Sequence, residues 1–69
     1  MSETVKNRVY LLRVARGVTQ ETLGEAIGVT RQTIIAIEKG NYVPSVLLAI
    51  KIAKFFKRPV EAIFVAEKK

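Results

Sequence analysis

The chain has 69 residues, 49% of them hydrophobic, and this composition predicts one folded domain over residues 1–69 rather than a disordered segment. Its 12 Lys and Arg residues outnumber its 6 acidic residues, and the net charge of +6 favours an anionic partner, with nucleic acid as the first choice. Cysteine and histidine are absent, so we expect no metal site, no cofactor and no enzymatic activity.

Short local signals divide the chain into five predicted helices. The glycines that suit the left-handed position after a helix are Gly17, Gly28 and Gly40. The hydroxyl residues that can cap a following helix are Thr19, Thr30 and Ser45. The predicted helices cover about residues 5–16, 20–27, 31–39, 45–57 and 60–64. This pattern predicts an all-α fold, a compact bundle of five short helices, in which residues 63–66 either end a helix or form a short strand.

The fourth predicted helix, residues 45–57, is apolar on nearly all sides, which is typical of the central helix of a bundle. With Lys51, Lys54 and Arg58 on one side it also resembles a basic helix that lies on a membrane surface. We favour the bundle, because capped helices on either side supply a core. No apolar run approaches the roughly 20 residues of a membrane span, and no hydrophobic export segment follows Met1. We therefore expect a cytoplasmic protein without a membrane partner.

The third predicted helix, RQTIIAIEK at residues 31–39, presents two different faces at about 100° per residue. Ile34 and Ile37 define the buried face, and the opposite face carries an amide, a methyl group and cations but no acid. Guanidinium and amide groups make paired hydrogen bonds with guanine and adenine edges, and a helix of about 13 Å fits a major groove about 12 Å wide. The residues predicted to read bases of double-stranded DNA are Arg31, Gln32, Thr33 and Ala36.

The segment TQETLGEAIGVTRQTIIAIEKG, residues 19–40, carries a wider pattern. Gln20 opens its first helix, Leu23 and Gly24 lie in the middle of that helix, and Gly28 lies in the turn. The flanking matches are Arg13-x-x-x-Gly17-x-Thr19-Gln20, Glu38-Lys39-Gly40-x-Tyr42-x-Pro44-Ser45 and Pro59-Val60-Glu61-x-Ile63-Phe64. Together they resemble the helix-turn-helix of phage repressor and Cro proteins, the XRE-type transcription regulators, over about residues 6–65. The resemblance implies a lambda-repressor-like fold and sequence-specific DNA binding that regulates transcription.

The resemblance also implies roles for residues outside the third helix. In the family, the glutamine matched by Gln20 touches a DNA phosphate and braces the recognition helix, and Arg13 and Glu38 resemble a partly buried structural ion pair. The other candidates for contact with the DNA backbone are Thr19, Lys39, Asn41 and Tyr42. Helix capping by Thr19, turn chemistry at Asn41 and packing of Tyr42 are the structural alternatives. Ile35 contacts either a thymine methyl or a second subunit, and the sequence leaves this open.

A single short helix reads only a few base pairs, so we expect a symmetric homodimer whose half-sites lie about 34 Å apart. The predicted contact is the apolar tail at Ile63, Phe64 and Val65, because it would otherwise be exposed. The short chain leaves little room for an effector domain, which favours a repressor, and shows no site for a small-molecule ligand. The alternative is an antitoxin-like or other protein-interaction module in which DNA binding is secondary.

Overall fold

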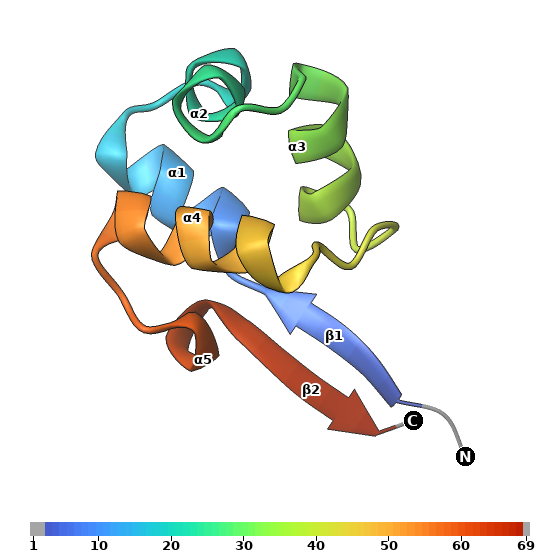
Figure 1. Ribbon diagram of the computed structural model, residues 1–69. Coiled ribbons are helices and arrows are strands. Elements are labelled where there is room, and N and C mark those ends of the chain that lie inside the picture. The colour runs from blue at the N-terminus through green and yellow to red at the C-terminus, as the bar shows by residue number, and fades with distance from the viewer. Residues whose placement is uncertain (1–2, 69) are drawn as a thin grey trace.

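The structure is a computed structural model that describes residues 3–68. Its elements in chain order are β1 (Glu3–Asn7), α1 (Val9–Arg16), α2 (Gln20–Ile27), α3 (Arg31–Glu38), α4 (Val46–Phe56), α5 (Val60–Ile63) and β2 (Phe64–Lys68). In Figure 1, α2 and α3 lie above α4, whereas α5 and the two strands lie below it. The prediction of five short helices is confirmed for this part of the chain. The all-α class is wrong in one respect, because the two ends of the chain form a small sheet.

The first predicted helix, residues 5–16, begins too early. Residues Glu3–Asn7 form β1, which pairs antiparallel with β2 so that Val5 lies opposite Ala66. Of the two alternatives that the sequence left open for residues 63–66, Ile63 ends α5 and the residues from Phe64 on form a strand. The N-terminal strand was missed. β-branched residues such as Thr4 and Val5 favour a strand when a partner strand is available. That partner lies at the other end of the chain, so the local sequence gives no sign of it.

Asn7 forms the junction between β1 and α1. Its side-chain oxygen accepts a hydrogen bond from the backbone N–H of Val9 at 3.1 Å, which starts α1. Its amide Nδ2 donates to the carbonyl of Ile37 at 2.9 Å, which links the strand to the end of α3. One polar side chain therefore ends the strand, starts the helix and ties both to the helix-turn-helix.

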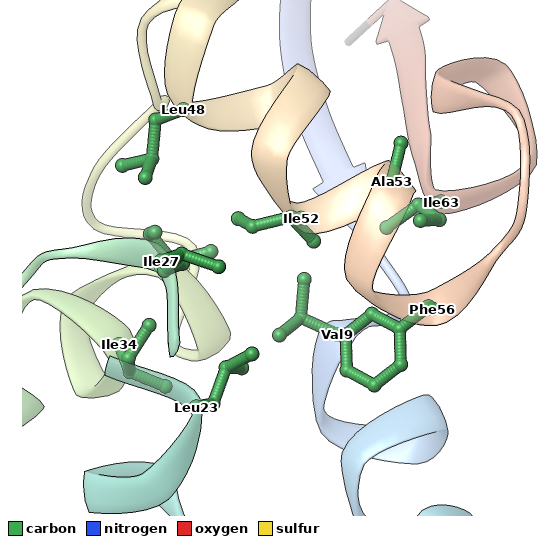
Figure 2. Packing of buried hydrophobic residues seen from close by; sticks show 10 residues of the cluster. Val9, Leu23, Ile27, Ile34, Leu48, Ile52, Ala53, Phe56 and Ile63 are labelled. Atoms are coloured by element: carbon green, nitrogen blue, oxygen red, sulfur yellow. The ribbon is translucent and has the colours of Figure 1, made fainter. Parts of the chain in front are cut away.

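The core is made of apolar side chains from all five helices, and Figure 2 shows them converging on one another. Its buried members are Val9, Leu23, Ile27, Ile34, Ile37, Leu48, Ile52, Ala53, Phe56 and Ile63. Four of these belong to α4, so α4 is the central helix, as its composition predicts. Fully burying a side chain such as Ile52 stabilises the fold by roughly 1.5–3 kcal/mol. No helix in the described ranges is long and apolar enough to cross a membrane.

Candidate nucleic-acid interface

The turn between α2 and α3 is short and closely packed because it contains one glycine, Gly28, and packs against a second, Gly24, inside α2. Gly28 ends α2 with φ +80°, a conformation that side-chain-bearing residues rarely adopt. The carbonyl of Gly24 accepts hydrogen bonds from the N–H groups of Gly28 and Val29, the latter at 2.8 Å. A Cβ on Gly24 would lie only 2.7 Å from the carbonyl oxygen of Val29. The turn therefore closes directly onto α2, and this contact sets the angle at which α3 leaves it.

The inward face of α3 is anchored in the core. Ile34 and Ile37 are fully buried, and Figure 2 shows Ile34 in the same cluster as Leu23 of α2. At the start of the helix, the hydroxyl of Thr30 accepts a hydrogen bond from the backbone N–H of Thr33 at 3.3 Å. The two isoleucines and the cap fix the rotation of α3 about its axis, so its other face is held toward the outside.

The outward face of α3 is open and free of acid. Arg31, Gln32 and Lys39 are exposed, and Thr33 and Ala36 are half-buried. Within residues 3–68, no side-chain hydrogen bond or ion pair engages Arg31, Gln32 or Lys39. Of the four residues that the sequence nominated for base reading, Arg31 and Gln32 are thus open to solvent, whereas the rest of the chain partly covers Thr33 and Ala36.

A buried polar network holds the far end of α3. Arg13 of α1 forms a bidentate ion pair with Glu38, with Nε–Oε2 and Nη2–Oε1 distances of 2.6 and 3.2 Å. The two side chains are only 12% and 6% exposed. The hydrogen bond to Glu38, partly opposed by burial, raises the pKa of Arg13 above its ordinary value, so the guanidinium stays charged. Arg13 Nη1 also donates to the carbonyl of Val18 at 2.9 Å.

Gln20, the first residue of α2, joins the same network. Its Nε2 donates to Glu38 Oε1 at 3.1 Å, which connects the start of α2 to the end of α3. A terminal amide carries two N–H donors and one oxygen acceptor. The contact with Glu38 therefore braces α3 and leaves one donor of Gln20 for a partner outside the chain.

The remaining candidates lie at the start of α2 and in the loop after α3. Thr19 caps α2, because its hydroxyl accepts a hydrogen bond from the N–H of Thr22 at 3.0 Å. Lys39, Asn41 and Tyr42 follow α3 in an exposed loop, in which the backbone N–H of Asn41 returns to the carbonyl of Ala36 at 3.0 Å. These side chains lie near the two ends of the helix-turn-helix, where a duplex lying along α3 would present its phosphates.

Lys51 is a cation that the sequence did not connect with this surface. Its Nζ lies 3.9 Å from the place that a Cβ on Gly28 would occupy, so it reaches the turn between α2 and α3. In the sequence, Lys51 is visible only as one member of a basic cluster on the fourth helix. Its position beside the turn depends on how α4 packs against α2, which the local pattern does not indicate.

The tail was predicted to form a dimer contact because its apolar side chains were expected to be exposed, and most of them are not. Ile63 is completely buried in the core of its own chain, so we withdraw it as a contact residue. Phe64 is half-buried and packs against that core, and Val65 is 37% exposed. The larger exposed apolar side chains lie elsewhere, chiefly on α1 and α4.

α2 and α3 are two short helices joined by a tight turn, and α3 has one face anchored in the core and one open face. This arrangement defines a DNA-binding helix-turn-helix. A family model described as helix-turn-helix matches residues 9–63. The chain belongs to this family, the XRE-type helix-turn-helix transcriptional regulators, as the sequence pattern predicts.

Individual relatives agree with this assignment. The chain is 58% identical over 60 residues to the uncharacterized HTH-type transcriptional regulator YgzD of Bacillus subtilis, which covers 87% of this chain and 91% of YgzD. It is 41% identical over 54 residues to the cryptic phage CTXphi transcriptional repressor RstR of Vibrio cholerae, covering 78% of this chain and 49% of RstR. Among solved structures, Bacillus thuringiensis PlcR in complex with the peptide PapR7 and DNA matches with a TM-score of 0.73 and 31% identity, over 80% of this chain and 19% of PlcR.

Proposed function

We propose that this chain binds a specific sequence of duplex DNA with α3 in the major groove and thereby regulates transcription. The observation that carries the proposal is the contrast between the two faces of α3. One face is fixed by Ile34 and Ile37, and the other is open, free of acid and supplied with hydrogen-bonding groups. Direct reading of base edges requires a helix face that is held rigidly and whose hydrogen-bonding groups have no partner within the protein.

The proposed division of labour follows from the chemistry of each side chain. Arg31 and Gln32 supply paired donors and acceptors for guanine and adenine, and Ala36 lets a thymine methyl approach closely. Thr33 lies at the edge of the face, where its hydroxyl is 3.3 Å from that of Thr30 and can still turn toward a base. These four side chains would carry the sequence preference.

Contacts with the phosphate backbone would come from residues around the two ends of the motif. The members of this set are Thr19, Gln20, Lys39, Asn41 and Tyr42. Support comes from the free donor of Gln20 and from the exposure of the loop after α3. Such contacts position a protein on the duplex without reading its sequence.

We further propose that residues 1–69 act as one DNA-binding unit, that two copies bind a twofold-symmetric operator in the cytoplasm, and that the outcome is repression. The twofold arrangement is supported by the small footprint of one α3, which covers too few base pairs to define a unique site. The relative RstR, described as a transcriptional repressor, supports the proposed outcome.

Selection of bound duplexes from a random pool tests this function, with the mass of each complex measured alongside. We expect one enriched motif in two copies related by symmetry, with centres about 34 Å apart, bound by two chains. Arg31→Ala should broaden the enriched motif at one position in each copy, while Glu61→Ala, on the distant α5, should leave it unchanged. A pool that remains unenriched at low salt would refute the proposal.

A further inference from the structure

An exposed apolar surface runs from the end of the α3–α4 loop along the first half of α4. Its members, which we call the α4 patch, are Val43, Val46, Leu47 and Ile50, exposed by 61%, 78%, 64% and 40%. The helical residues among them are spaced so that they share one side of α4. The buried residues Leu48, Ile52 and Phe56 occupy the opposite side. The α4 patch is therefore the outer face of the central helix, and no described part of the chain covers it.

We infer that the α4 patch is the surface on which a second copy of this chain docks. This inference rests on the proposed function for its purpose, because reading two half-sites requires two copies of α3. It replaces the contact expected at the tail, where Ile63 is buried and Val65 is the only one of the three residues with an exposed side chain.

The amount of exposed surface suits a self-contact. The four exposed fractions correspond to about 400 Å² of surface, within the roughly 300–600 Å² of the largest apolar patch on a monomer, a patch that often has a function. It is about half of the ~800 Å² that each partner of a stable complex buries. Neighbouring side chains, including the stem of Lys54, can supply the rest of the interface. A contact of this composition has an apolar centre and a charged rim, as protein interfaces do.

Charge favours a twofold arrangement in which two α4 helices cross in opposite directions. The outer side of α4 is apolar in its first half and cationic in its second half, at Lys54 and Lys57. Antiparallel crossing near Leu47 brings the apolar halves together and sends the two copies of Lys54 to opposite ends. Because seven residues of helix span about 10 Å, those two cations would lie about 20 Å apart, beyond the Debye length of about 8 Å.

The α4 patch is also well placed for the DNA-binding geometry. It begins at Val43, which directly follows Asn41 and Tyr42 in the α3–α4 loop, so a second copy docked there lies beside the proposed DNA surface. The principal dimensions of the described chain are 36 × 22 × 21 Å. Equivalent points on two such bodies in contact are separated by on the order of 20–40 Å, a range that includes the 34 Å between successive major grooves.

The chain offers a matched pair of leucines for the test. Leu47 lies in the α4 patch and Leu11 lies on α1, and they are 64% and 63% exposed. Leu47→Glu should weaken self-association about 100-fold or more, because it places two carboxylates near the twofold axis. Leu11→Glu adds the same charge at the same exposure and should leave the dimer intact, as should Val65→Glu in the tail. Sedimentation equilibrium of the full chain without DNA measures all three, and circular dichroism verifies that each variant is folded.

The outcomes separate this inference from the proposed function. A wild-type chain that stays monomeric at all concentrations, or a Leu47→Glu chain that stays dimeric, overturns the inference, as does selective dissociation by Leu11→Glu or Val65→Glu. If Leu47→Glu does not fold, Val46→Glu at the most exposed position of the patch takes its place.

Monomeric Leu47→Glu should still bind a duplex with one half-site, but its affinity should not increase when a second half-site is added. A wild-type dimer that ignores every duplex would refute DNA reading and leave the α4 patch as the dimer contact.

Discussion

The two helices of the motif are built by the same local rules but carry different chemistry on their outer faces. Both α2 and α3 have eight residues, and both begin after a threonine in an extended conformation. Thr19 has φ −78° and ψ 162°, and Thr30 has φ −80° and ψ 161°. Each hydroxyl accepts a hydrogen bond from the N–H three residues later. The same capping device therefore starts both helices.

The difference between the helices lies in their exposed side chains and in how each one ends. Exposed Glu21 and Glu25 make the outer side of α2 acidic, whereas α3 turns its single carboxylate, Glu38, into the protein. α2 ends at Gly28 in a turn that packs closely against Gly24, and α3 ends in the ion pair between Glu38 and Arg13. Caps and apolar anchors thus determine that a helix forms. Its outward side chains determine whether it faces water or an anion.

The largest effect is expected at the end of α3. Glu38→Ala leaves Arg13 charged and without its carboxylate partner in a site where its side chain is 12% exposed. We expect the free energy of unfolding to fall by about 3–5 kcal/mol, measured by urea denaturation, since removing one member of a buried pair strands the other charge. This is a large part of the stability of a small domain.

The exposed ion pair between Lys6 and Glu67 is the control for Glu38→Ala. Its N–O distance is 3.2 Å, and its side chains are 67% and 47% exposed. Lys6→Ala should change the free energy of unfolding by less than about 1 kcal/mol, because water screens such a pair. Equal losses for the two variants would contradict the role of burial in anchoring α3.

The next effect concerns the outer faces. Gln32→Ala on α3 should weaken binding to the selected duplex by about 1–3 kcal/mol and leave the unfolding curve unchanged, because Gln32 is exposed and has no partner within the described chain. Glu25→Ala at an exposed position of α2 should not weaken binding. Titrations on the selected and on a scrambled duplex measure both variants. If Gln32→Ala weakened binding equally on both duplexes, Gln32 would not read a base.

A smaller effect is expected where the turn packs against the middle of α2. Gly24→Ala gains about 1 kcal/mol of helix propensity. The added Cβ, 2.7 Å from the Val29 carbonyl, forces the turn to move, and such overpacking costs about 1–3 kcal/mol. We expect a net loss of about 1 kcal/mol in the free energy of unfolding. Ala26, exposed on the same helix, is the matched site, where alanine should be more stable than glycine by about 1 kcal/mol. A stabilised Gly24→Ala variant would show that the turn yields easily.

The sequence predicted α2 and α3 well because their signals are local. A hydroxyl cap, two apolar anchors and a following glycine all lie within about a dozen residues, and the predicted helices at 20–27 and 31–39 match the observed bounds to within one residue. The open face of α3 followed from the same helical spacing. The local pattern did not show how α3 is held, because Gln20, Arg13 and Glu38 meet only in the folded chain. The family resemblance did imply the Arg13–Glu38 ion pair and the bracing by Gln20, and the structure contains both contacts.

The errors arose where the answer depends on segments that are distant in the sequence. β1 forms because β2 pairs with it, and without knowledge of that partner the sequence predicted residues 5–7 as the start of a helix. α4 is apolar on nearly all sides, so its pattern could not show that Leu48 faces the core and Leu47 faces outward. The burial of Ile63 likewise depends on how α5 packs against α4, which no local pattern encodes.

The smallest expected effect tests whether the two helices really begin alike. Thr19→Ala and Thr30→Ala each remove one capping hydroxyl, and each should lower the free energy of unfolding by about 1 kcal/mol. Because the two caps share the same backbone angles and the same hydrogen-bonding pattern, we expect the two losses to agree within about 0.5 kcal/mol. Thr→Ser at either position keeps the hydroxyl and should restore most of the loss. Each capping hydroxyl also contacts the hydroxyl three residues later, Thr19 with Thr22 at 2.9 Å and Thr30 with Thr33 at 3.3 Å. A much larger loss at Thr30 would therefore show that α3 depends more on its cap than α2 does.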